Sequence, residues 1–138
     1  MHPLALPQAL AFWRKVADDV SRGERGLLVA HDAQGLCGTV QLVLAQPPNQ
    51  PHRADLAKVL VHRRARRRGF GEALTRAAEG LARDCGKSLL VLDTVAGSAA
   101  ERLYGRLGWQ SVGIILGYAL LPRGGLRDTH YFYRDLNG

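Results

Sequence analysis

The sequence predicts a mixed α/β (α+β) fold with its elements in the order α-β-β-β-α-β-α-β-β. Apolar residues recur at helical spacing in three segments, and six apolar runs bounded by turn residues are typical of strands. The 138 residues, 46% of them hydrophobic and 22% charged, are enough to build one globular unit with a buried core. We therefore expect a single domain over residues 1–138.

The first third of the chain predicts a helix followed by a hairpin. Apolar residues at helical spacing predict a helix over residues 7–21, which Gly23 ends. Residues 26–31 and 36–45 are apolar runs typical of strands. The short polar segment between them, residues 32–35, ends in a glycine, so the two strands are expected to pair as a hairpin.

A strand, a basic loop and a helix form the centre of the chain. The strand is predicted over residues 53–62, and five of the nineteen basic residues follow within residues 63–68. Gly69 and Gly71 lie at the start of a helix predicted over residues 69–84, whose first amide groups lack partners inside the helix. Glycines let a phosphate approach the backbone, and arginines bind it through paired hydrogen bonds. The pattern fits pyrophosphate binding, and it fits equally well a solvated basic loop that only caps the helix.

The second half predicts a strand, a short helix and two further strands. Residues 88–93 form a nearly all-apolar run of the kind that is buried on both faces. Ser98 and Glu101 have the spacing of a capping box, which opens a helix that runs through Leu107. The last two strands are predicted over residues 109–115 and 129–134.

The formal net charge of +7 implies an anionic partner. The crowding of arginines in one loop suits a compact polyanion such as a nucleotide cofactor. The aromatic residues that alternate with basic ones in RNA-binding segments are missing there, which disfavours nucleic acid as the partner. A basic nucleic-acid-binding module remains an alternative because the pI is about 10.1.

The chain shows no pattern of a metal site or of a secreted disulfide framework. Cys37 and Cys85 lie far apart, and Cys85 continues the apolar face of the central helix, which predicts a small core residue. His31, His52 and His130 have no ligand spacing, so no metal is expected. The first residues lack the pattern of a signal peptide, and no apolar run is long enough for a transmembrane helix, so we expect a cytoplasmic protein.

Two motifs resemble those of one enzyme family. Arg66-x-x-Gly69-x-Gly71 resembles the Arg/Gln-x-x-Gly-x-Gly/Ala signature of the GNAT superfamily of acetyl-CoA-dependent N-acetyltransferases. Residues 103–109, Leu-Tyr-Gly-Arg-Leu-Gly-Trp, resemble the carboxy-terminal motif of the same superfamily. The resemblance implies a GNAT-like mixed, mostly antiparallel sheet flanked by helices, and acetyl transfer to a primary amine of a small molecule. It is closest to the tabtoxin-resistance acetyltransferase branch through residues 53–55, 92–94, 96–98 and 117–118.

The resemblance also implies direct attack of the amine on acetyl-CoA while both are bound. Tyr104 would donate a proton or a hydrogen bond to the leaving thiolate; the alternative is a half-buried aromatic residue of the core. An alkylammonium has a pKa of about 10.4, so a base is needed near pH 7. Asp55 is the first candidate and Asp93 the second, although Asp55 is equally well explained as a surface carboxylate paired with an arginine. A backbone N–H of Leu60 or Val61 would stabilise the thioester oxygen.

The same resemblance places acetyl-CoA along the central strand and loop. The pantetheine arm would run beside Leu60 and Val61, and the pyrophosphate would bind the amides of residues 67–72. Arg63 and Arg64 are expected to meet the ribose phosphate or only solvent. The full set expected to bind the cofactor is Leu60, Val61, Arg66, Arg67, Arg68, Gly69, Phe70, Gly71, Glu72, Ser98 and Tyr104.

The beginning of the chain departs from the family pattern. Members of the superfamily begin with a strand and a helix before the hairpin, whereas this chain enters at what resembles the second helix. A bared sheet edge and apolar face attract a partner, so we expect a homodimer. Two other functions stay open, namely a family member that binds acetyl-CoA without transferring its acetyl group, and the nucleic-acid-binding module.

Overall fold

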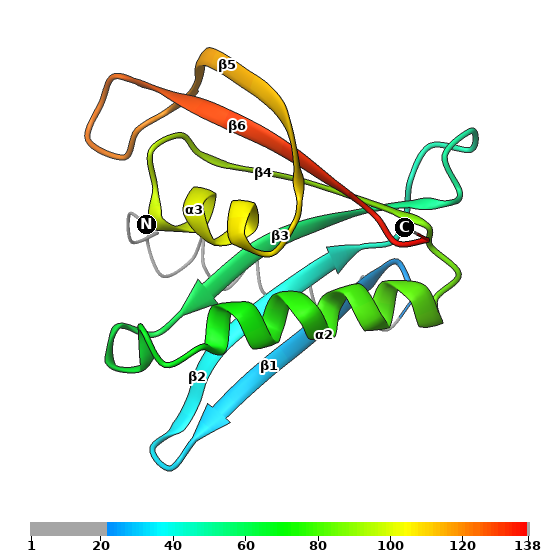
Figure 1. The fold of residues 1–138 in the computed structure, drawn as a ribbon, viewed down its shortest axis with the longest axis horizontal. Helices are drawn as coiled ribbons and strands as arrows, with labels where there is room; N and C mark the ends of the chain where they lie inside the picture. Colours follow the sequence, from blue (N-terminus) through cyan, green and yellow to red (C-terminus); the bar gives the residue numbers. More distant parts are fainter. Residues whose placement is uncertain (1–21, 138) are drawn as a thin grey trace.

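The computed structural model describes residues 22–137, which form one six-stranded sheet in the order β1-β2-β3-β4-β6-β5 (Figure 1). Neighbouring strands are antiparallel except for β3 and β4, which are parallel. The strands are β1 (Arg25–Asp32), β2 (Gly35–Val43), β3 (Arg53–Val61), β4 (Leu89–Val95), β5 (Gln110–Leu120) and β6 (Leu126–Asp135).

Helices cover one face of this sheet. The long helix α2 (Phe70–Asp84) packs across β1, β2 and β3, whereas the shorter α3 (Ala99–Arg106) packs on β4 (Figure 1). A single turn of 3-10 helix, η1 (Arg63–Ala65), joins β3 to the loop before α2. The strand side chains in the core alternate with side chains on the opposite face. The core includes Val40, Leu42, Ala54, Leu56, Leu74, Ala78, Ala82, Leu90 and Leu92.

The predicted order of elements is confirmed wherever the structure describes the chain. Ser98 accepts a hydrogen bond from the amide of Glu101 at 3.2 Å, so α3 begins with the predicted cap. The last two strands are longer than predicted, because β5 continues through residues 116–120 and β6 begins at Leu126. The helix predicted over residues 7–21 lies outside the described residues.

One burial prediction is wrong. Cys85 is exposed, because α2 ends at Asp84 and the chain turns away from the sheet through Cys85 and the left-handed Gly86. The apolar stripe therefore stops contacting the core one turn earlier than its spacing suggests, at Ala82. No helix within residues 22–137 is long and apolar enough to cross a membrane.

Candidate functional site

The two parallel strands at the centre of the sheet pair only at one end. Arg53, Ala54 and Asp55 of β3 lie beside residues 89–91 of β4, and beyond that point the strands diverge (Figure 1). The part of β3 that follows Asp55 therefore has a hydrogen-bonded neighbour on its β2 side only. An open strand edge presents backbone N–H and C=O groups to an extended molecule, as in strand addition.

A bulge lies in this unpaired part of β3. Leu60 is opposite Thr39 and Ala57 is opposite Gln41, so two residues of β3 face one residue of β2. The His62 amide donates to the Cys37 carbonyl on β2. Because successive amides of a strand point to opposite sides, the Val61 amide points towards the open edge and the Leu60 amide towards β2. Of the two predicted oxyanion donors, the geometry favours Val61.

The loop after β3 leads into the amino terminus of α2, which has no side-chain cap. Arg67 and Gly69 have positive φ values of 64° and 82°, which turn the chain sharply into α2. Gly69 is the N-cap residue and provides no side-chain hydrogen bond to the first amides of the helix. A Cβ added at Gly69 would meet no atom within 4 Å, so the space beside this glycine is open. Such a terminus binds an anion.

The arginines of this loop divide into two groups. Arg64 donates to Asp32 at 2.9 Å and to the carbonyl of Leu36 at 3.1 Å, so it fastens the hairpin turn of β1 and β2. Of the two expectations for Arg64, contact with solvent alone is wrong, because its guanidinium pairs with Asp32; contact with a ribose phosphate stays a prediction. The hydrogen bond from Arg64 lowers the pKa of Asp32 to about 2. Arg68 also reaches Asp32, at 3.3 Å, whereas Arg66 and Arg67 are exposed and make no ion pair with any residue in 22–137.

Other predicted cofactor ligands border this opening from the two helices. A Cβ at Gly71 would lie 3.2 Å from a methyl group of Leu103, so this glycine lets the start of α2 approach α3. The Phe70 ring lies under the Arg68 guanidinium, 5.2 Å from it, and Glu72 is exposed in the first turn of α2. Ser98, another predicted ligand, uses its hydroxyl as the cap of α3.

Tyr104 lies on the helix-covered face of the sheet. Its side chain is 4% exposed, and its ring centroid lies 5.8 Å from that of Trp109 and 6.0 Å from that of Phe132. Burial raises the pKa of the Tyr104 phenol to about 12. A phenol with this pKa keeps its proton near neutral pH, so it can act as a hydrogen-bond donor but not as a base.

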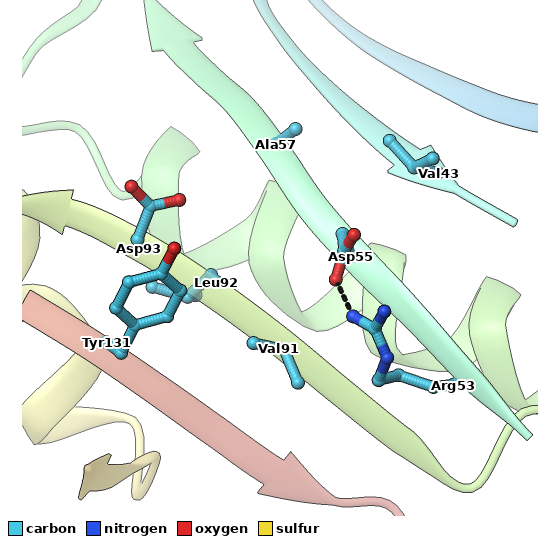
Figure 2. Close-up of a pocket in the computed structure, with 8 residues that line it drawn as sticks. All are labelled: Val43, Arg53, Asp55, Ala57, Val91, Leu92, Asp93 and Tyr131. Carbon is cyan, nitrogen blue, oxygen red and sulfur yellow. Dashed lines mark hydrogen bonds and ion pairs between the residues drawn. The ribbon is translucent and has the colours of Figure 1, made fainter. Parts of the chain in front are cut away.

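A pocket of about 320 Å³ lies on the opposite face, where β3 and β4 separate. Figure 2 shows Asp55 from β3, Asp93 from β4 and Tyr131 from β6 around it. Asp55 and Asp93 occupy alternate positions to the core residues of their strands, which places both on the face away from α2. The other residues that line the pocket are Val43, Arg53, Ala57, Val91 and Leu92.

The two carboxylates of the pocket have different partners. Asp55 forms an ion pair with Arg53 and accepts a hydrogen bond from Gln46 at 3.3 Å. Asp93 accepts a hydrogen bond from the hydroxyl of Thr129 at 3.0 Å, and no cation pairs with it among the described residues. The sequence offered two explanations for Asp55, a catalytic base and a surface carboxylate paired with an arginine. The structure shows the ion pair with an arginine, and it also places Asp55 in the lining of the pocket.

Tyr131 is a pocket residue that the sequence reasoning missed. Its hydroxyl lies 2.7 Å from that of Tyr118, and the two rings meet edge to face. The hydrogen bond with Tyr118, together with burial and the nearby Asp93, raises the pKa of Tyr131 to about 12. Thr129, Tyr131 and Tyr133 alternate along the predicted strand, and this alternation could have indicated a polar face that includes Tyr131.

The chain is similar to one protein family and to several solved structures. Residues 4–109 match the model of the acetyltransferase (GNAT) family. Among solved structures, yncA from Salmonella typhimurium, determined with its cofactor acetyl-CoA, has a TM-score of 0.79 and 20% identity over 96% of this chain and 75% of that one. A ribosomal-protein-alanine N-acetyltransferase from Brucella melitensis has a TM-score of 0.81 and 22% identity over 91% and 78% of the two chains. At these identities the structural likeness shows a shared fold.

Proposed function

Since this chain belongs to the acetyltransferase (GNAT) family, we propose that it transfers an acetyl group from acetyl-CoA to a primary amine of a small molecule, with both molecules bound together. The observation that carries the proposal is the separation of β3 from β4 after Asp55. An uncapped, basic helix terminus lies at one side of this gap, and a pocket with two carboxylates lies at the other. The gap thus joins a site for a polyanion to a site for a cation.

Acetyl-CoA supplies an activated acetyl thioester and a thiolate leaving group when it is bound. The features of this chain fit that molecule. The open edge of β3 offers backbone groups to the pantetheine arm, and the open space beside Gly69 and the uncapped first amides of α2 suit the pyrophosphate. Arg66 and Arg67 add exposed positive charge beside those amides. In this assignment the Val61 amide, which points to the open edge of β3, would stabilise negative charge that develops on the thioester oxygen.

Tyr104 would donate a proton or a hydrogen bond to the thiolate of bound CoA. Its phenol is protonated throughout the physiological range because its pKa is about 12. The contacts with Trp109 and Phe132 hold the ring in one orientation, which limits the entropy lost in placing the hydroxyl.

Asp93 is the base that we assign, acting directly or through a water molecule. The amine nucleophile must lose a proton, and a carboxylate in hydrogen-bond reach can accept it. The ion pair with Arg53 compensates the charge of Asp55, which leaves Asp93 as the carboxylate of the pocket without a cationic partner among residues 22–137. Asp55, the first candidate from the sequence, stays paired with Arg53 and is not assigned the role of base.

The chemistry of the pocket supports a small cationic acceptor. Arg53 compensates Asp55, so the Asp93 carboxylate gives the pocket a net negative charge, which favours a positively charged ligand. A volume of about 320 Å³ lies at the lower end of small-molecule pockets. The resemblance of residues 92–94 and 96–98 to the tabtoxin-resistance branch agrees with a small acceptor.

An acetylation screen tests this proposal. The protein is incubated with acetyl-CoA and a panel of small primary amines, amino acids and peptide amino termini, and released CoA thiol is measured together with the mass of the product. We expect acetylated small amines, and a lower rate with the Asp93→Asn variant. Transfer to peptides alone would refute the small-molecule acceptor. Acetyl-CoA binding with no transfer to any amine would favour the non-catalytic alternative.

A further inference from the structure

Three polar side chains from three different elements form a chain of hydrogen bonds away from the pocket. The hydroxyl of Ser111 on β5 lies 2.6 Å from Nε2 of His130 on β6, and Nδ1 of His130 lies 2.8 Å from a carboxylate oxygen of Glu101 on α3. His130 stacks on the core residue Phe132, with ring centroids 4.2 Å apart, so it lies on the helix-covered face of the sheet. Tyr131 and the pocket lie on the other face, because adjacent residues of a strand point to opposite faces.

The charge of Glu101 determines the direction of both hydrogen bonds. The hydrogen bond from His130, together with one from the amide of Gly97 at 3.1 Å, lowers the pKa of Glu101, so its carboxylate is ionised near neutral pH. An ionised carboxylate only accepts, so the ring proton of a neutral His130 is on Nδ1. Nε2 then accepts the hydrogen bond that the Ser111 hydroxyl donates. A nucleophile, a base and a carboxylate that orients the base thus follow one another, as in a Ser-His-acid triad.

The exposure of the three side chains suits such a site. The side chains of His130 and Glu101 are 15% and 25% exposed, so the base and its orienting carboxylate are largely shielded from water. Ser111 is exposed, so a molecule from solvent can reach its hydroxyl oxygen. A Cβ added at Gly113 would meet no atom within 4 Å, so the space beside this glycine is open. The nucleophile is therefore accessible while its base is held in place.

A bulge in β5 follows the serine directly. Ser111 and Gly113 lie opposite neighbouring residues of β6, whereas no residue of β6 is paired with Val112 between them. Val112 is the extra residue of the bulge, which the ladder of the two strands leaves unpaired. The amide directly after a nucleophilic serine is the position from which α/β-hydrolases stabilise an acyl oxyanion. The Val112 amide has this position in the chain.

The surface around Ser111 indicates the class of substrate. Residues 110–121 contain no charged side chain. Val112 is 65% exposed, and Ile114, which is paired with His130 and so lies on the same face of the sheet, is 52% exposed. An uncharged acyl group gains free energy by packing on such side chains, whereas a charged group would lose hydration without gaining a partner. The site therefore suits a small uncharged ester.

We propose that Ser111, His130 and Glu101 form a second reactive site, which hydrolyses small uncharged carboxylic esters through an acyl-serine. The Ser111 oxygen forms a bond to the carbonyl carbon while its proton moves to Nε2 of His130. The bond from this carbon to the alcohol oxygen then breaks, and the alcohol leaves with the proton from Nε2. Water attacks the acyl-serine and gives a proton to Nε2, and Ser111 recovers this proton as the carboxylic acid is released. Glu101 is a positioning residue, because it touches no reacting atom.

Covalent labelling tests the site without acetyl-CoA or an amine, so its result is independent of the proposed function. The full chain is incubated with an alkyl fluorophosphonate, and the adduct is located by peptide mass spectrometry. We expect about one adduct per chain, on Ser111, and its loss in Ser111→Ala. Ser88→Ala, which removes a serine hydroxyl before β4, is the matched control and should be labelled like the wild type.

Hydrolysis of p-nitrophenyl acetate tests the reaction itself. Ser111→Ala and His130→Gln should each lower the rate at least about tenfold. His52→Gln, which removes an exposed histidine outside the site, is the control and should keep the wild-type rate. Glu101→Gln should lower kcat at least about tenfold with an unchanged KM, because an amide does not fix the proton on Nδ1 as a carboxylate does.

Several results would overturn the inference. No adduct on Ser111, or equal labelling of Ser111→Ala, would show that this hydroxyl is not activated. An adduct on Ser111 with no ester hydrolysis above that of Ser111→Ala would refute the hydrolytic reaction. Circular dichroism checks the fold of each variant, and the exposed substitution Ser111→Ala decides the matter if His130→Gln does not fold.

Discussion

Replacing Tyr104 with phenylalanine isolates the hydroxyl group from the rest of the side chain. The ring contacts with Trp109 and Phe132 do not involve the hydroxyl, so they remain in the variant. A general acid typically raises the rate of a reaction by about 10²- to 10⁴-fold. Because a thiolate leaves readily even without a proton, we expect a smaller effect here, a fall in kcat of at least about tenfold. This corresponds to about 1.4 kcal/mol of transition-state stabilisation. The Kd of acetyl-CoA should change little.

Steady-state kinetics by thiol release, together with calorimetric binding of acetyl-CoA, provides the assay. Tyr133→Phe, which removes a hydroxyl from β6 outside the pocket, is the control and should keep the wild-type kcat. Because the pKa of Tyr104 is about 12, kcat should not fall from its ionisation below about pH 11. An unchanged kcat in Tyr104→Phe would refute the assignment, and a large loss of acetyl-CoA binding would indicate a binding role instead.

Three further substitutions test the pocket, the hairpin and the helix cap. Asp93→Asn should lower kcat/KM for the acceptor about a hundredfold and more than Asp55→Asn does; a larger loss in Asp55→Asn would return the role of base to that residue. Because the pKa of Asp32 is lowered, its ionised carboxylate stabilises the fold above about pH 4, and this stabilisation is lost as the pH falls towards 2. Arg64→Ala should therefore lower the urea midpoint at pH 7, and the midpoint of this variant should fall less on acidification than that of the wild type. Ser98→Ala should lower the free energy of unfolding by about 1 kcal/mol and the Tm measured by calorimetry by about 4 °C; an unchanged Tm would contradict the capping role of Ser98.

Local signals in the sequence were enough to predict most elements of the sheet. Ser98 caps α3 through the amide of Glu101, and Gly86 turns the chain at the end of α2. Both features depend only on residues close together in the sequence, so local patterns predict them. The basic loop was likewise predicted as the turn into a helix, and the structure shows its uncapped terminus. The exposure of Cys85 could not be predicted, because it depends on where α2 ends and the chain turns away from the sheet.

The pocket depended on contacts that no local pattern contains. Asp55 and Asp93 share a cavity because two strands pair for three residues and then separate, a feature of the sheet and not of either strand. Tyr131 belongs to the cavity only because β6 lies beside β4. Arg64 shows the same limit, since its charge suggested a phosphate ligand but the hairpin turn, far away in the sequence, supplies the Asp32 carboxylate.

Isothermal titration with acetyl-CoA, CoA and ATP tests the central claim most directly. The open edge of β3 and the terminus of α2 should bind the first two ligands tightly, and ATP, which lacks the pantetheine arm, at least tenfold more weakly. The double change Arg66→Ala and Arg67→Ala should weaken acetyl-CoA binding at least tenfold, while Arg123→Ala in the β5–β6 turn should leave it unchanged. No binding of acetyl-CoA, or equal binding of ATP, would contradict the assignment of this site.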